Sequence, residues 1–381
     1  MLVDSIGYGL IIPLIPFYAL AFGATPTLLG VMVASFALMQ FFFAPILGRF
    51  SDKVGRRPVL SLSLLISTVS FIIFTIANSF IMLLFSRIIA GMATEYGVAY
   101  AYVSDISDEQ RRASVLGKIG AASNIGIIVG PAVGGFMNIY GRFWAPGLAA
   151  IILNLLNLLS VYLFLPETIS AGNKDTVKER SGTPFIKKIT AFLISPVTGP
   201  ALGILFVMSF AFSAMPVVLP LFSWDVFGLG EAEVGFFFTY IGIIGLLVQL
   251  LLVGRLSRRI GDAAVAILGI LLTITGIFSI PVFLDLTVFM LAITVVSIGL
   301  FLVDVAVPSF LSKKTNPEYY GGIMGVSESM GSIARVPGPF IAGFAYQLAL
   351  IAPFMVAGLM LIGALGLGIV TSKRSDRKMD S

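Results

Sequence analysis

The sequence has no cysteine and no histidine, and only 11% of its 381 residues are charged. A chain without these two side chains has no disulfide, no thiolate or imidazole ligand for a metal ion, and no catalytic group built on a Cys nucleophile or a His base. Proton chemistry is therefore left to Asp and Glu. We expect no metal ion and no cofactor.

Hydrophobic residues make up 58% of the chain, and its mean hydropathy is +1.03. Such a chain cannot bury its apolar surface in a soluble globule and needs lipid as its solvent. Segments long enough for a helix to cross a bilayer lie at residues 1–22, 28–48, 58–77, 80–103, 114–138, 144–165, 198–222, 232–254, 263–283, 287–310, 321–345 and 351–372. They predict an all-α membrane protein of twelve transmembrane helices.

One long polar segment, residues 166–197, interrupts these apolar runs and has the Gly, Ser and Pro content of a linker. It predicts an N-terminal six-helix half at 1–165 and a C-terminal six-helix half at 198–372, followed by a tail at 373–381. The linker is too short for an ATPase domain, and the sequence has no GxxxxGKS or GxxxxGKT motif. We therefore expect energy to come from an ion gradient.

Basic residues give the expected orientation. All of the 24 Lys and Arg residues except Arg87, Arg142 and Arg335 lie at alternate connections, in the linker or in the tail. The positive-inside rule places this side in the cytoplasm, with the protein in the inner or plasma membrane. The net charge of +5 then indicates the cytoplasmic leaflet, not nucleic acid, as the partner.

The two halves repeat. GRFSDKVG at 48–55 recurs as GRLSRRIG at 254–261. Five further residues recur 208 positions later: Gly117, Gly130, Pro131, Gly135 and Phe136 as Gly325, Gly338, Pro339, Gly343 and Phe344. Two parallel six-helix repeats are the architecture of secondary transporters that rock one pseudo-symmetric half against the other. Because Arg258 stands where the first half has Asp52, we expect a switch built on Asp52 not to be duplicated.

Several motifs resemble those of the major facilitator superfamily, and the resemblance covers almost the whole chain. The loop between the second and third helices resembles its signature at Gly48, Asp52, Gly55, Arg56 and Arg57. Arg87 with Gly91 is similar to its helix 4 motif, although Ala90 replaces the usual polar residue. GIIVGPAVGG is similar to its helix 5 antiporter motif at Gly126, Gly130, Pro131, Gly134 and Gly135.

LVDSIGYGLIIPLIP at 2–16 resembles helix 1 of the twelve-helix drug/proton antiporters, tetracycline-type and multidrug exporters among them. Tetracycline exporters use a histidine in the second half, which this chain lacks. The family places the counterpart of Asp4 well inside its span, so we expect about ten further residues upstream of Met1.

The charged loop has two interpretations. In the first, it is only an orientation signal, with Gly55 permitting a tight turn. In the second, Asp52 and Arg56 make charge-assisted contacts with neighbouring helix ends and form a cytoplasmic gate. The resemblance implies Asp105 as the partner of Arg56. The helix 5 glycines likewise predict either ordinary close packing or a bending gate at Pro131.

Ionisable residues within spans are costly and point to function. The candidates for proton coupling are Asp4, Arg87, Glu95, Asp304, Glu328 and Arg335. Each is alternatively a member of a structural ion pair. Helices 3, 6, 9 and 12 carry no such residue, so we expect them to face lipid. The repeat places Asp304 within one residue of Glu95, which predicts that the two face each other across the pseudo-two-fold axis.

Glu328 and Arg335 are seven residues apart, too far for a direct pair unless the arginine reaches back.

No nucleophile with a base and no metal cluster occurs, so we expect a transporter and not an enzyme. The resemblance implies proton-coupled efflux of lipophilic drug-like small molecules by a monomer in the lipid bilayer. A metabolite or sugar exporter or importer of the same superfamily is the alternative.

Overall fold

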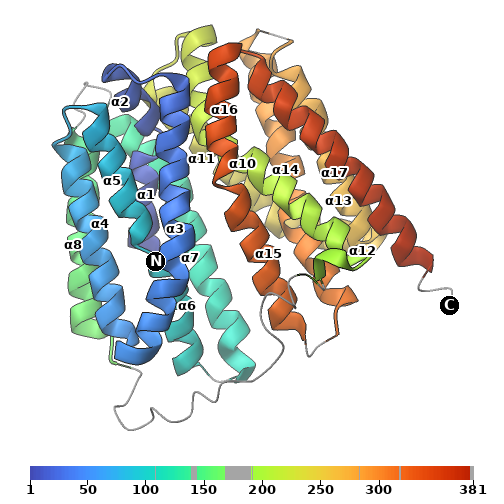
Figure 1. Ribbon diagram of the computed structural model, residues 1–381, viewed down its shortest axis with the longest axis horizontal. Coiled ribbons are helices and arrows are strands. Elements are labelled where there is room, and N and C mark those ends of the chain that lie inside the picture. The colour runs from blue at the N-terminus through green and yellow to red at the C-terminus, as the bar shows by residue number, and fades with distance from the viewer. Residues whose placement is uncertain are drawn as a thin grey trace. The chain divides into compact units, whose positions relative to one another are not determined.

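The computed structural model describes residues 1–107, 109–138, 144–167, 190, 192–282, 284–316 and 319–377, and all its regular elements in these ranges are helices (Figure 1). Eleven helical segments, some of them made of consecutive helices, are long and apolar enough to cross a membrane. The prediction of an all-α membrane protein is confirmed. The predicted linker and the end of the predicted tail lie largely outside the described residues.

The chain forms two compact units. The first contains the chain from Met1 to the linker together with Leu219–Gly242, and the second contains the remainder. Helices of the first unit are α1 (Leu2–Ile11), α2 (Ile15–Ala21), α3 (Pro26–Val54), α4 (Arg56–Thr75), α5 (Phe80–Met92), α6 (Glu95–Ile106), α7 (Glu109–Met137) and α8 (Trp144–Phe164). The predicted half boundaries at 165 and 198 stay predictions.

The rest of the chain supplies α10 (Thr198–Phe227), α11 (Glu231–Leu247), the π-helix η1 (Val248–Val253), α12 (Gly254–Ile260), α13 (Asp262–Ser279), α14 (Leu286–Lys314), α15 (Tyr320–Ala334), α16 (Pro337–Leu348) and α17 (Ala352–Arg377). The unit boundary divides both α10 and α11. Side chains mark several helix starts: the Thr25 and Ser79 hydroxyl groups and the Asp285 carboxylate accept backbone N–H groups of α3, α5 and α14.

In the described part of the chain, eleven segments are long and apolar enough to span a membrane, where the sequence predicts twelve; two of the eleven, Leu2–Ala21 and Phe80–Ile106, each consist of two consecutive helices. The difference is the predicted span 321–345, which forms α15 and α16 with an interruption at Arg335 and Val336. Pro337 and Pro339 follow this interruption, and proline lacks the N–H group that a continuing helix needs. The segment is therefore helical but broken, and each of its two parts is shorter than a full span.

Equivalent helices pack together in both units. In the first unit, α4 packs against α5 and α8, and α1 packs against α7. In the second unit, α13 packs against α14 and α17, which correspond to α5 and α8 of the first unit. Gly338 of α16 lies against Ser213 of α10, just as Gly130 of α7 lies against Gly9 of α1. Each unit by itself thus has the packing that an internal repeat requires.

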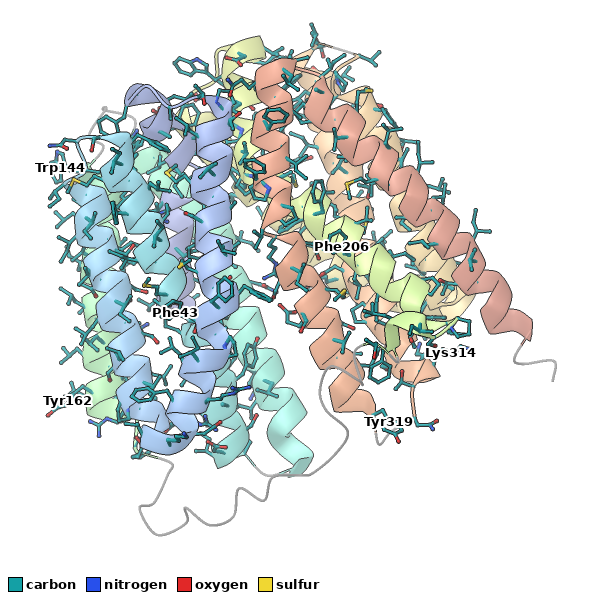
Figure 2. All side chains as sticks on the ribbon, viewed as in Figure 1. Phe43, Trp144, Tyr162, Phe206, Lys314 and Tyr319 are labelled. Atoms are coloured by element: carbon teal, nitrogen blue, oxygen red, sulfur yellow. The ribbon has the colours of Figure 1, made fainter. Side chains whose placement is uncertain are left out.

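The outer face of α8 has the character of a lipid-facing helix. Leu148, Ile152, Leu155, Leu159 and Leu163 are exposed along it. Trp144 and Tyr162 lie near its two ends (Figure 2) and are also exposed. Eighteen residues of helix separate them by about 27 Å, close to the thickness of the hydrocarbon core, and such aromatic residues favour membrane interfaces.

Candidate functional site

Three charged residues from different helices meet beside the turn between α3 and α4. Gly55 joins the two helices with φ of 120°, a conformation that favours glycine. Arg56, the first residue of α4, places Nη1 2.5 Å from Asp52 Oδ1 and Nε 2.9 Å from Oδ2 of Asp105 near the end of α6. The Arg56 side chain is only 11% exposed. We call Asp52, Arg56 and Asp105 the first-unit triad; it joins the ends of α3, α4 and α6.

Glu167, assigned to the linker by its sequence position, belongs to this turn. Its carboxylate accepts the backbone N–H groups of Arg56 at 3.0 Å and Arg57 at 3.2 Å, and so satisfies the N-terminus of α4. Arg57 itself donates to the Tyr162 carbonyl oxygen and stacks over the Tyr162 ring. A Cβ atom added to Gly48, the first residue of the signature, would meet no atom of the described part of the chain within 4 Å.

The glycines of the helix 5 motif face α1. A Cβ atom on Gly126 would lie 2.6 Å from Ser5 Cβ, and one on Gly130 would lie 2.7 Å from Gly9 Cα. Gly134 meets the Leu10 carbonyl group in the same way. The two helices therefore approach through backbone atoms, as small residues at every fourth position permit. Pro131 and Gly135 of the motif lie instead near Gly235 and Ala232 of α11.

Glu95 stands at a break in its span. α5 ends at Met92 and α6 begins at Glu95, so the carboxylate lies at a helix N-terminus. Glu95 is 7% exposed, and the Ser67 hydroxyl of α4 donates a 2.7 Å hydrogen bond to its Oε1. Among the described residues, no Lys or Arg lies within ion-pair distance of it. Because a buried carboxylate needs a proton or a cation to offset its charge, Glu95 is suited to bind either.

Asp4 lies beside this carboxylate. It is half-buried in α1, and its neighbour Ser5 makes a 2.7 Å hydroxyl–hydroxyl hydrogen bond with Tyr96 of α6. The Asp4 and Glu95 carboxyl groups interact electrostatically. The structure thus brings together two of the acidic residues that the sequence singles out, on α1 and α6 of one unit.

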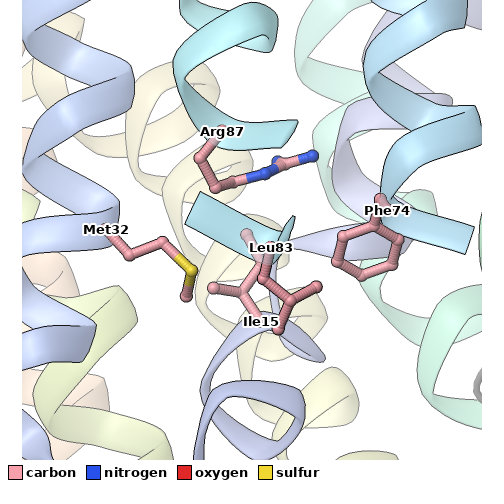
Figure 3. A pocket seen from close by; sticks show the side chains of 5 residues that line it. All are labelled: Ile15, Met32, Phe74, Leu83 and Arg87. Atoms are coloured by element: carbon pink, nitrogen blue, oxygen red, sulfur yellow. The ribbon is translucent and has the colours of Figure 1, made fainter. Parts of the chain in front are cut away.

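Arg87 is a buried cation in apolar surroundings. It is 2% exposed, and its guanidinium lies 5.3 Å from the centre of the Phe74 ring. Nε donates weakly to the Ser86 hydroxyl at 3.5 Å, while Nη2 has no hydrogen-bond partner in the described part of the chain. Figure 3 shows it beside a small pocket that has no room for a water molecule and is also lined by Ile15, Met32, Phe74 and Leu83.

The second-unit candidates are more open. Arg335 does reach back along its helix: Nη2 lies 3.3 Å from Glu328 Oε1. Both side chains are exposed, so this pair contributes little stability in water. Asp304 of α14 is exposed as well. Its predicted position opposite Glu95 stays a prediction, because the two residues belong to different units.

Ser67 belongs to the site around Glu95, but a search of the sequence for charged residues alone does not find it. The third helix is expected to face lipid because it carries no ionisable residue within the span, yet Ser63, Ser67 and Ser70 of α4 are buried. Ser70 donates to the Ser86 carbonyl oxygen of α5, and Ser67 to Glu95. Their spacings of four and three residues place them on one helix face, a signal that is present in the sequence.

Known proteins resemble this chain over nearly its whole length. Multidrug resistance protein 2 of Bacillus subtilis is 29% identical over 379 residues, which are 98% of this chain and 94% of that protein. The class B tetracycline resistance protein of Escherichia coli is 28% identical over 358 residues, 92% of this chain and 87% of that protein.

Solved structures share the fold. The human organic anion transporter MFSD10 (TETRAN) matches with a TM-score of 0.68 at 24% identity, over 96% of both chains. A bacterial homolog of the human lysosomal transporter Spinster, in an inward-facing and occupied conformation, has a TM-score of 0.76 at 17% identity, over 98% of this chain and 94% of that one. The Major Facilitator Superfamily model matches residues 1–339, and the chain belongs to this family of membrane transporters.

Proposed function

We propose that the protein is a proton-coupled exporter of lipophilic drug-like compounds that works by alternating access. The observation that carries this proposal is the buried Glu95 carboxylate, which has Asp4 nearby and, among the described residues, no Lys or Arg within ion-pair distance. The names of the relatives, which are multidrug, tetracycline and quinolone resistance proteins, favour drug efflux over other transport.

Each part of the proposal has its own residues. Asp4 takes up and releases the proton, while Glu95 attracts the positive charge of cationic substrates. A proton shifts the conformational equilibrium only if it binds the two states with different affinity, so the surroundings of Asp4 have to differ between them. The first-unit triad acts as a gate on the cytoplasmic side, where we also place the linker and the C-terminus.

The test is transport in inverted membrane vesicles with an acidic lumen. We expect ethidium, a lipophilic cation, to accumulate inside vesicles that contain the protein, and a protonophore to abolish the accumulation. Vesicles that contain Asp4→Asn protein at equal expression are the control and should accumulate none. Ethidium accumulation that does not depend on the pH gradient would contradict proton coupling. Gradient-driven flux of a sugar or metabolite, with none of ethidium, would favour the alternative within the superfamily.

A further inference from the structure

A second charged turn joins α12 to α13. Gly261 connects the two helices with φ of 81°, and Asp262 is the first residue of α13. The Asp262 side chain is only 4% exposed. Its Oδ2 accepts hydrogen bonds from Lys313 Nζ at 2.7 Å and from the Ser309 hydroxyl at 2.9 Å, both on α14. The start of α13 is thereby joined to the end of α14.

Three residues of the second unit, Arg258, Asp262 and Lys313, occupy the positions of the first-unit triad with every charge inverted. Aligning GRFSDKVG with GRLSRRIG places Arg258 at the position of Asp52, and Asp262 follows Gly261 as Arg56 follows Gly55. The repeat of 208 positions places Lys313 at the position of Asp105. Two acids around a base in the first unit thus become two bases around an acid in the second. Inverting every charge leaves each interaction attractive or repulsive as before, because the sign of a Coulomb energy depends on the product of the two charges.

The two sets differ in how many contacts they make. Arg56 pairs with both of its acids, whereas Asp262 pairs with one of its two bases, Lys313, among the described residues. Its other oxygen, Oδ1, is buried and has no hydrogen-bond partner among the described residues. Arg258 stands four residues before Asp262, as Asp52 does before Arg56, and its side chain is exposed. A buried carboxylate oxygen without a donor is unfavourable, and a guanidinium on the preceding turn is placed to supply one.

We propose that Arg258, Asp262 and Lys313 form a second-unit triad, a charge-inverted counterpart of the first, whose Arg258 contact with Asp262 Oδ1 closes at another stage of the transport cycle. The triad positions the turn between α12 and α13 against α14. Two arrangements of one turn, with Arg258 away from Asp262 or bound to it, make a two-state element that transport can use. The switch expected to be absent from the second half is therefore present with opposite polarity.

The test uses purified protein and four sets of substitutions. Asp262→Asn removes the central charge. Asp262→Arg with Lys313→Asp exchanges one pair but leaves a new arginine beside Arg258. Adding Arg258→Asp completes the first-unit polarity, and adding Arg259→Asp in its place is a control of equal charge at the next exposed residue.

Amide hydrogen exchange at residues 262–265 reports the turn without any substrate. We expect Asp262→Asn to speed exchange on the order of tenfold, as loss of one charge-assisted hydrogen bond predicts. The exchanged pair should recover part of the protection, and the Arg258→Asp triple variant should recover more than the Arg259→Asp triple variant. Equal recovery by the two triple variants would remove Arg258 from the triad, and unchanged exchange in Asp262→Asn would refute the positioning role.

Ethidium transport in inverted vesicles adds the functional readout, which rests on the proposed function. Triad variants should lower the turnover number and leave KM unchanged, and the Arg258→Asp triple variant should regain turnover. Failure of the unsubstituted protein to move ethidium would contradict the proposed drug efflux, while the exchange measurements would still decide the triad. Normal turnover in Asp262→Asn would show that the triad has no part in transport.

Discussion

Replacing Gly130 by alanine tests whether α1 and α7 must touch through their backbones. The added Cβ atom would lie 2.7 Å from Gly9 Cα and 2.8 Å from the Ile6 carbonyl oxygen. Carbon atoms pack best at about 3.5–4.0 Å, so α1 has to move away by roughly 1 Å. Overpacking of this kind costs about 1–3 kcal/mol. Alanine also favours the helix by about 1 kcal/mol, which partly hides the effect.

Gly117→Ala is the matched control, because Gly117 lies in the same helix and no atom of the described residues stands within 4 Å of the position that its Cβ atom would take. Both substitutions gain the same helix propensity, so their difference isolates the close approach. We expect Gly130→Ala to be less stable than Gly117→Ala by about 1–3 kcal/mol in the free energy of unfolding in detergent. Transport should fall only in Gly130→Ala. Equal stability of the two variants would refute the packing argument.

Four further substitutions test the charged residues. Asp52→Asn should lower turnover and leave stability almost unchanged, because a half-exposed ion pair contributes less than about 1 kcal/mol; unchanged turnover would leave the loop only its orientation role. Asp4→Asn should abolish pH-driven export but keep downhill exchange, and concentrative export by this variant would make Glu328 the next candidate for proton coupling. Glu95→Gln should weaken the binding of cationic substrates more than that of neutral ones. Glu167→Ala should lower the free energy of unfolding by about 1 kcal/mol through loss of two backbone hydrogen bonds at α4, and unaltered thermal unfolding would contradict that.

Hydropathy predicts the membrane helices well, because a span must be apolar over its whole length whatever it packs against. It cannot predict where spans break. No proline or glycine occupies the break before Glu95, which falls at Ala93 and Thr94, so the local sequence gives no signal for it. The break at Arg335, in contrast, precedes Pro337 and Pro339 and is readable as a local signal.

Among contacts between residues distant in the sequence, some can be predicted from the sequence and others cannot. The pairing of Arg56 with Asp105 is implied by the family motif, since both ends of that contact belong to a known pattern. Glu167 falls in the linker because composition there is polar, and composition carries no information on which backbone groups a carboxylate meets. A search for repeats that compares residue types does not find Asp262 and Lys313, because their charges are opposite to those of Arg56 and Asp105.

The bond between Glu167 and the start of α4 also bears on how the protein can be cut into two coexpressed halves. A first fragment that ends at residue 165, where the apolar run stops, would lose the only described side chain that accepts the Arg56 and Arg57 amide hydrogens. A fragment that continues beyond Glu167 keeps them bonded. Split versions, inserted tags and protease sites therefore belong farther along the linker, where they leave this helix start intact.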